Sequence, residues 1–263
     1  MIDPARLSLN LMTVDHWDLP EALERCVAGG IGWVAPWRHQ LAQLGVAKSA
    51  EAIRAAGLAV SSLCRGGFFT AEGADEDNRR AVEEAAAVGA PVLVLVCGPP
   101  VDGDLPGARA AIAAGIERLL PYAADHGVRL AIEPLHPMMV GERSAIVTLG
   151  EALELARSYA SPHVGVAVDA YHVFWDPQLE PLLASADGLI AAYHVCDWLV
   201  PTTDLLAGRG LMGDGIIDLV RLSGLVEAAG YTGPIEVEVI NPALADVPGD
   251  ELVADIKARF ARL

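Results

Sequence analysis

The sequence predicts a single (β/α)8 barrel, the TIM-barrel form of the α/β class, over the whole of residues 1–263. Short β-branched or apolar runs recur along the chain and alternate with amphipathic segments. Runs such as PVLVLV and VGVAVD are apolar throughout, as parallel strands are when helices cover the sheet. The chain length also fits the roughly 250 residues of such a barrel. The alternative is an open doubly wound sheet, because a strand count from one sequence is easily wrong by about one or two.

The expected strands follow one another at the intervals of a βα repeat. They are 7–12, 31–36, 58–63, 91–96, 129–134, 164–169, 189–195 and 235–240. Helices fill the gaps, and Thr148 with Glu151 forms a capping box at the start of one of them. One face of a final helix is marked by Leu252, Ile256, Phe260 and Leu263. Helices are expected to end at Gly29-Gly30, Gly57, Gly127 and Gly230, each shortly before the next strand.

Composition narrows the classes of partner. Hydrophobic residues make up 53% of the chain and charged residues 20%, which is enough to bury a sizeable core and argues against disorder. The net charge of −17 repels nucleic acid and anionic membrane surfaces, so neither is an expected partner. We expect a small-molecule ligand instead, and homo-oligomer formation is left open.

The cysteines and the apolar runs bear on location. The four cysteines, Cys26, Cys64, Cys97 and Cys196, form no C-x-x-C pair, so neither a structural zinc site nor a disulfide framework is predicted. No apolar run reaches the roughly 18 to 20 residues of a membrane span. The first residues also lack the pattern of a secretory signal. A cytoplasmic protein is therefore expected.

The stretch GRGLMGDG, residues 208–215, contains the pattern G-x-G-x-x-G of dinucleotide-binding loops. That pattern indicates a nucleotide site only when it directly follows a buried strand and opens a helix of a βαβ unit. Here the last expected strand ends well upstream, at residue 195. The glycines are therefore interpreted as a turn-rich loop before a helix.

Ionisable residues stand at the ends of four successive expected strands. They are Glu133, Asp169, His194 and Glu238. Active residues of a barrel lie at the C-terminal ends of its strands, and a charged group beside an apolar strand is costly unless it is paired. Taken singly, each acid could be only a cap or an ion-pair partner. Glu236 competes with Glu238, because both point to the same side of the strand and differ only in depth.

Three carboxylates and one imidazole form a hard, anionic ligand set for one divalent metal ion. Mn²⁺ is the ion expected first, with Mg²⁺, Co²⁺ or Zn²⁺ as alternatives. The ion would offset the repulsion among the acids. Without it, at least one carboxyl group should hold its proton at neutral pH.

These positions lie in segments that together resemble a known family. In chain order the segments are LAIEPLHP, VAVDAYH, YHVCD, GRGLMGDGIID and GYTGPIEVE. They are similar to the xylose-isomerase-like barrel superfamily of sugar isomerases and epimerases, whose members include ketose 3-epimerases, hydroxypyruvate isomerase, inosose dehydratase and endonuclease IV. The resemblance implies that Glu133, Asp169, His194 and Glu238 hold the metal. It also implies that Glu133 and Glu238 are the catalytic acid/base pair.

The resemblance implies substrate contacts as well. His172 lies three residues after Asp169, as in the family's D-x-x-H, and Arg209 begins R-G-x-x-G-x-G-x-x-D, in which the arginine reaches a substrate oxygen and Asp218 opens the next helix. Residues placed near the barrel mouth by their position after strands are His136, Arg65, Trp37, Arg38 and, within the first strand, Asn10. Two features depart from the ketose 3-epimerases: Met139 replaces a substrate-contacting Glu, and the loop before Arg209 is longer than usual.

The function expected is a metal-dependent isomerase or epimerase of a small ketose or keto-polyol, working through an enediolate. A metal-dependent lyase of the same barrel type, acting on an inosose, a dehydroshikimate or a keto-glycoside, is the alternative, with His136 or His172 as its acid. A nuclease of the endonuclease IV type is disfavoured, because it would need a three-metal cluster with many more histidine ligands and a basic groove. The chain has only seven histidines and a net charge of −17. A sugar-binding barrel without activity remains the non-enzymatic hypothesis.

Overall fold

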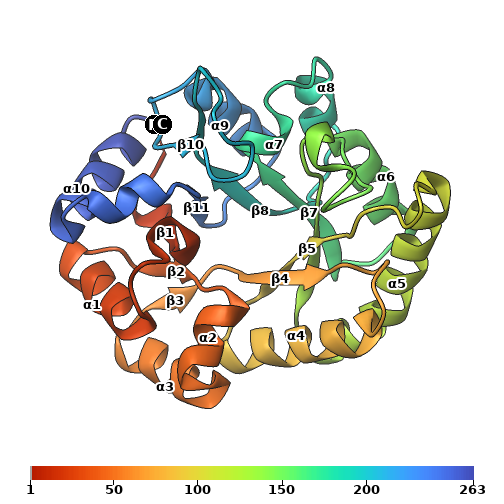
Figure 1. Cartoon of the computed structure of the whole chain (residues 1–263), viewed down its shortest axis with the longest axis horizontal. Coiled ribbons are helices and arrows are strands. Elements are labelled where there is room, and N and C mark those ends of the chain that lie inside the picture. Colours follow the sequence, from red (N-terminus) through yellow and green to blue (C-terminus); the bar gives the residue numbers. More distant parts are fainter. Residues whose placement is uncertain (1) are drawn as a thin grey trace.

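The computed structural model describes residues 2–263; Met1, the first residue of the predicted barrel, lies outside them. A nine-stranded parallel sheet curls into a nearly closed barrel, and helices surround it (Figure 1). Its strands are β1 Leu7–Asn10, β2 Trp33–Ala35, β3 Ala59–Val60, β4 Leu63–Gly67, β5 Val92–Val96, β6 Arg129–Glu133, β7 Val164–Asp169, β8 Ile190–Val195 and β11 Ile235–Val237. The predicted TIM barrel is confirmed, and the doubly wound alternative is wrong.

The strand order around the barrel is β3-β2-β1-β11-β8-β7-β6-β5-β4. The third expected strand, 58–63, is corrected by the structure into two strands: β3 pairs with β2, and β4 pairs with β5. This strand changes partner because the strands of a closing barrel are staggered along its axis. A parallel bridge between Trp37 and Cys64 brings β4 next to the chain that continues β2. The split thus lies at the seam where the barrel closes.

The helices form the outer ring seen in Figure 1. They are α1 Leu19–Gly29, α2 Arg38–Leu44, α3 Val46–Ala55, α4 Ala74–Val88, α5 Leu105–Asp125, α6 Leu149–Ser158, α7 Ala170–Val173, α8 Leu179–Ala184, α9 Leu219–Ala228 and α10 Gly249–Phe260. The predicted capping box of Thr148 and Glu151 opens α6, and Asp218 caps α9 by accepting from the Arg221 amide. Among residues 2–263 no helix is long and apolar enough to cross a membrane.

The core lies mainly between the helices and the outer face of the barrel. The barrel interior is narrow and lined by small apolar side chains, among them Cys64, Val94, Ala131, Ala167 and Ala192. Buried polar residues also lie within the first, third and last expected strands, among them Ser8, Asn10, Ser61 and Glu236. The nine strands of the barrel run in parallel, so their C-terminal ends form one rim, and the four expected strand-end residues lie at this rim.

A two-stranded antiparallel hairpin follows β8 and carries the glycine-rich segment. It consists of β9 Asp197–Trp198 and β10 Arg209–Gly210. The buried Asp197 carboxylate accepts hydrogen bonds from the amides of Trp198, Gly213 and Ile217, at 2.9, 3.0 and 2.9 Å. A Cβ atom at Gly215 would lie 2.1 Å from the Trp198 carbonyl oxygen, so only glycine fits there. The glycines therefore allow close packing of a loop, as the sequence predicted.

Candidate functional site

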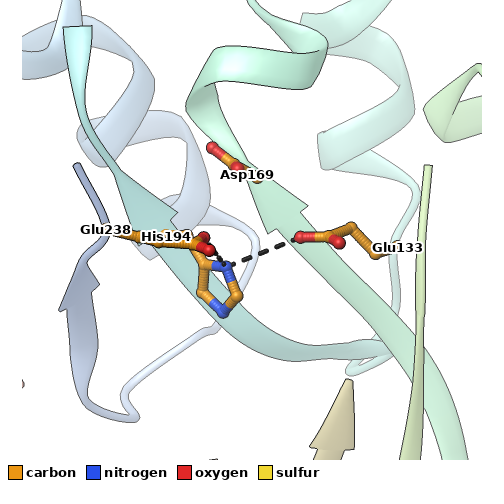
Figure 2. A group of neighbouring side chains, drawn as sticks. All are labelled: Glu133, Asp169, His194 and Glu238. Carbon is orange, nitrogen blue, oxygen red and sulfur yellow. Dashed lines mark hydrogen bonds and ion pairs between the residues drawn. The ribbon is translucent and has the colours of Figure 1, made fainter. Parts of the chain in front are cut away.

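Four side chains converge at the C-terminal rim of the barrel, as the sequence predicted. Glu133 ends β6, Asp169 ends β7, His194 lies in β8, and Glu238 directly follows β11. Each offers one ligand atom, and these atoms lie within 4.8 Å of one another. All four are buried, so the group is shielded from bulk water. Figure 2 shows the carboxylates of Glu133, Asp169 and Glu238 arranged around one end of the His194 ring.

The two nitrogens of His194 face different acids. Nδ1 lies 3.0 Å from Oε2 of Glu238 and 3.6 Å from Oε1 of Glu133. Nε2 points away from this group, into the barrel, and lies 3.3 Å from Oε2 of Glu236. The imidazole thus bridges a carboxylate cluster at the rim and a single carboxylate beneath it.

Arg209 supplies the positive charge next to the cluster. Its guanidinium lies 3.1 Å from Oδ2 of Asp169 and 3.7 Å from Oε2 of Glu238, and it packs over the Tyr171 ring at 4.5 Å. Only 2% of the residue is exposed, so burial strengthens these ion pairs. Oδ1 of Asp169 accepts from the Tyr171 amide at 2.8 Å, which fixes the orientation of the carboxylate.

Burial and like charges set the protonation of the metal-free group. Burial raises the pKa of Glu133 to about 8, and the charges of Glu238 and Asp169 add to the increase. Burial opposes protonation of His194, but the charges of Glu236 and Glu238 raise its pKa to about 10. Burial raises the pKa of Glu238, but the hydrogen bond from His194 and the positive charges of Arg209 and His194 together lower it below its ordinary value. Without a metal, Glu133 and His194 therefore hold protons at neutral pH, as the sequence predicted for at least one carboxyl group.

The donor set fits a divalent cation. Three carboxylates and one imidazole nitrogen lie close enough to share one ion, and they come from the C-terminal ends of four neighbouring strands, β6, β7, β8 and β11. Oxygen-rich sets of this kind suit Mn²⁺, Mg²⁺ or Co²⁺, and Zn²⁺ also accepts such ligands. The residues that would hold the ion are Glu133, Asp169, His194 and Glu238.

Glu236 lies in a buried network below the rim. It accepts hydrogen bonds from Oγ of Ser61 at 2.8 Å and from Nδ2 of Asn10 at 3.0 Å. Asn10 accepts in turn from Nε1 of Trp37 at 2.8 Å. The sequence treated Glu236 as a competitor for Glu238, and the structure separates the two by depth: Glu238 faces Nδ1 of His194, and Glu236 faces Nε2. A carboxylate behind a ligating histidine orients the ring and selects its tautomer.

We expect Glu236→Gln to weaken divalent-metal binding by about 10- to 100-fold, the usual cost of removing such an outer carboxylate. The neutral glutamine amide lacks the negative charge that attracts the N–H at Nε2 of His194. The ring is therefore held less firmly with Nδ1 toward the cluster. Titration of Mn²⁺ into the metal-free variant measures the change. Glu117→Gln, an exposed change on α5, is the matched control. Equal affinities in the two variants would contradict an orienting role for Glu236.

Two neighbouring cavities open beside the cluster. A narrow one of about 20 Å³ is lined by Glu133, Glu238, His172 and Arg209. A wider one of about 460 Å³ lies next to it. The two share a wall made of Trp37, Cys64, Arg143, Leu206 and Ile240. The two cavities therefore adjoin each other across these five side chains.

The predicted substrate residues fall into two groups. Trp37, Arg65, His172 and Arg209 line these cavities. His136 is not among the described residues that line either one: its ring lies between Trp175 and Trp198, and its Nδ1 accepts from the Met138 amide at 3.2 Å. The structure thus places His136 behind His172, to whose Nδ1 it donates its own backbone N–H at 3.1 Å.

His172 is a neutral donor rather than an acid. Burial lowers its pKa to about 3, so the ring carries one proton at neutral pH. Nδ1 accepts from the His136 amide, which assigns the proton to Nε2; this atom lies 3.6 Å from Oδ2 of Asp169 and 3.4 Å from Nη2 of Arg209, at the narrow cavity. His172 can therefore donate a hydrogen bond to a ligand oxygen.

The sequence missed three features of the site. Asp197, whose carboxylate binds the amides of the glycine-rich loop, lies three residues after His194, and nothing in the sequence pattern indicated this role. Arg143 lies in the loop before α6, and only the fold shows that this loop reaches the cavity. The longer loop noted before Arg209 places Leu206 on the cavity wall, and the Tyr171 hydroxyl donates to the Leu205 carbonyl at 3.1 Å.

Comparison with protein families decides the family. A model described as the xylose isomerase-like TIM barrel matches residues 23–262, nearly the whole chain. The chain belongs to this family. The family resemblance of the five segments is thereby confirmed.

Solved structures with the xylose isomerase-like barrel are similar over almost the full length. Protein SMc04130 from Sinorhizobium meliloti 1021 has a TM-score of 0.94 and 44% identity, covering 99% of this chain and 98% of its own. The IolI protein, solved with a bound zinc atom, has a TM-score of 0.84 and 19% identity, covering 97% of this chain and 96% of its own. The second likeness shows the fold alone.

Two curated proteins match part of this xylose isomerase-like chain. An inosose isomerase from Halalkalibacterium halodurans is 25% identical over 54% of this chain and 50% of its own length. A 3-dehydroshikimate dehydratase from Pseudomonas aeruginosa is 28% identical over 59% of this chain and 24% of its own length. The matched region thus spans half or less of these relatives, and both isomerase and dehydratase names occur among similar proteins.

Proposed function

We propose that this protein is a divalent-metal-dependent isomerase or epimerase of a small ketose or keto-polyol. The observation that carries the proposal is the pair of buried carboxylates, Glu133 and Glu238. They come from different strands, lie on either side of Nδ1 of His194, and both line the narrow cavity. Two acids that flank one small space can remove a proton from a substrate carbon and return one to it.

The two acids differ in their readiness to hold a proton. Without a metal, the pKa of Glu238 is lowered and that of Glu133 is raised to about 8, so Glu238 gives up its proton first and Glu133 holds one more readily. Opposed carboxylates allow proton removal from one face of a carbon and return to the other, which epimerisation requires. Transfer between neighbouring carbons, as in aldose–ketose isomerisation, can use one of them. The roles exchange in the reverse direction.

The remaining site residues position the substrate and exclude water. When bound, a divalent ion supplies Lewis-acid stabilisation of negative charge on neighbouring substrate oxygens. His172 donates from Nε2 to a substrate oxygen, and Arg209 holds Asp169 in place. Met139 and Leu206 line the narrow cavity and keep it apolar on one side, which protects the deprotonated substrate from water.

Proton exchange in D₂O tests the proposed function. We expect the Mn²⁺-loaded protein to incorporate deuterium next to the carbonyl of at least one member of a panel of keto-sugars and keto-polyols. NMR locates the deuterium, and mass spectrometry shows that the product otherwise keeps the mass of the substrate. A panel without deuterium incorporation and without products, at confirmed metal occupancy, would contradict an isomerase or epimerase.

A dehydratase is the second candidate, and the matched 3-dehydroshikimate dehydratase favours it. It would use the same proton removal and then expel a neighbouring hydroxyl. His172, the histidine on the cavity wall, is neutral at pH 7 and has no imidazolium proton to give to a leaving group. The isomerase comes first because the opposed carboxylates Glu133 and Glu238 can both remove and return a proton. Loss of water from the product in the same D₂O experiment identifies the dehydratase.

A further inference from the structure

The wider cavity carries two arginines that pair with no acid in the described part of the chain, residues 2–263. Arg65 and Arg143 both line it, and Arg143 belongs to the wall shared with the narrow cavity at the carboxylate cluster. We propose that they form a binding site for an anionic group, a carboxylate or a phosphate, at the end of the substrate remote from the metal. The inference rests on the proposed function and names the substrate class: an acidic or phosphorylated keto-sugar rather than a neutral one.

The contrast with Arg38 shows that these charges are free. Arg38 lines the same cavity but pairs with Asp77 at 2.8 Å and with Glu84 at 2.5 Å. Among residues 2–263, neither Arg65 nor Arg143 has a carboxylate within ion-pairing distance. Arg65 packs instead against the Phe68 ring, with its guanidinium carbon 4.1 Å from the ring centroid. Its donors are therefore available to a ligand.

The two arginines also oppose each other. Burial lowers the pKa of Arg65, and the positive charges of Arg143 and Arg38 lower it further. Two half-buried cations that repel each other destabilise the empty cavity. An anion between them removes this repulsion and accepts charge-assisted hydrogen bonds from the guanidinium groups, which match carboxylate and phosphate oxygens in geometry.

Arg143 lies between the two ends of the site. It lines both cavities, and its charge contributes to lowering the pKa of Glu238, after the hydrogen bond from His194 and the charge of Arg209. Arg65 lines only the wider cavity. A volume of about 460 Å³ has room for the tail of a small sugar acid or sugar phosphate. In a chain of net charge −17, such a local cationic site also attracts an anion that the rest of the surface repels.

Binding of three related polyols tests the proposal without requiring turnover. The probes are D-sorbitol, sorbitol 6-phosphate and D-gluconate, titrated calorimetrically into the Mn²⁺-loaded protein. We expect at least one anionic probe to bind about tenfold or more tightly than sorbitol, and Arg65→Gln and Arg143→Gln each to reduce that affinity about tenfold, as loss of a charge-assisted hydrogen bond does. If only sorbitol 6-phosphate binds more tightly than sorbitol, the site recognises phosphate. If only gluconate does, the site recognises carboxylate.

Control variants separate local recognition from net charge and from misfolding. Arg54→Gln removes the same charge from the exposed surface of α3 and is expected to leave the affinities unchanged. Arg65→Lys and Arg143→Lys keep the charge and should retain more affinity than the glutamine variants. The proposal is overturned if sorbitol binds as tightly as both anions, or if Arg54→Gln weakens binding as much as the cavity variants do. If the anions bind preferentially but no ketose is turned over, only the proposed function is contradicted. If a ketose is turned over but the anions bind no more tightly than sorbitol, only the anion site is contradicted.

Discussion

Glu133→Gln and Glu238→Gln will each lower kcat by about 10³- to 10⁴-fold, the upper range for removal of a positioned acid or base. Glutamine has nearly the shape of glutamate but cannot accept or release a proton at neutral pH. Both side chains also contribute to the expected metal site, so each variant must be assayed at Mn²⁺ concentrations that restore full occupancy, verified by metal analysis. Steady-state kinetics on the substrate found in the D₂O panel measures the loss.

The pair of variants also distinguishes the two acids. If the two carboxylates act on opposite faces of one substrate carbon, each single variant keeps the carboxylate that removes the proton from one of the two epimers. Glu238→Gln should still exchange deuterium into the epimer served by Glu133, and Glu133→Gln into the other, while neither completes the epimerisation. Glu117→Gln is the control and should keep full activity. Loss of both exchange reactions in both variants, with metal bound, would mean that the two carboxylates act only as ligands.

The fold and the positions of the four strand-end residues could be predicted from the sequence. Apolar runs that are followed by an acid or a histidine have one natural place in a parallel barrel, which is its C-terminal rim. The split of the third strand could not be predicted in this way, because it depends on how β3 and β4 meet different partners at the closing seam. Local composition does not record which strand lies next to which.

The roles of Glu236 and Glu238 were harder to separate. They share one face of one strand, and only the height of His194 in β8 decides which nitrogen each acid meets. Arg143 carried no signal, because nothing in its own loop indicates a cavity. Arg209 matched a motif that implied a substrate contact, yet its guanidinium lies on Asp169 and over Tyr171. Its contact with substrate stays a prediction, because the partners of a long side chain depend on distant parts of the chain.

Metal removal should have the other large effect, and it should depend on pH. We expect chelator-treated protein to lose turnover by about 100-fold or more and to regain it with Mn²⁺, since the ion would stabilise the charge left by proton removal. Binding must displace the protons that the metal-free group holds on Glu133 and His194, whose pKa values are raised to about 8 and about 10. Below pH 8 both sites are protonated, so affinity should rise steeply with pH, by up to about 100-fold per unit when two protons are released.

The stability of the metal-free protein should change in the opposite direction. A group whose pKa is raised on folding stabilises the native state fully below its unfolded pKa, and this contribution is lost as pH rises through the folded value. For Glu133 the loss runs from its ordinary pKa of 4.5 to about 8, and for His194 from 6.5 to about 10. The melting temperature of chelated protein should therefore fall between pH 6 and pH 9 relative to that of the loaded protein.

Calorimetric titrations of the metal in buffers of different ionisation enthalpy count the protons released on binding. A count near zero, or turnover that survives chelation, would mean that the cluster does not hold a catalytic ion, because the buried carboxylates cannot all be ionised without one.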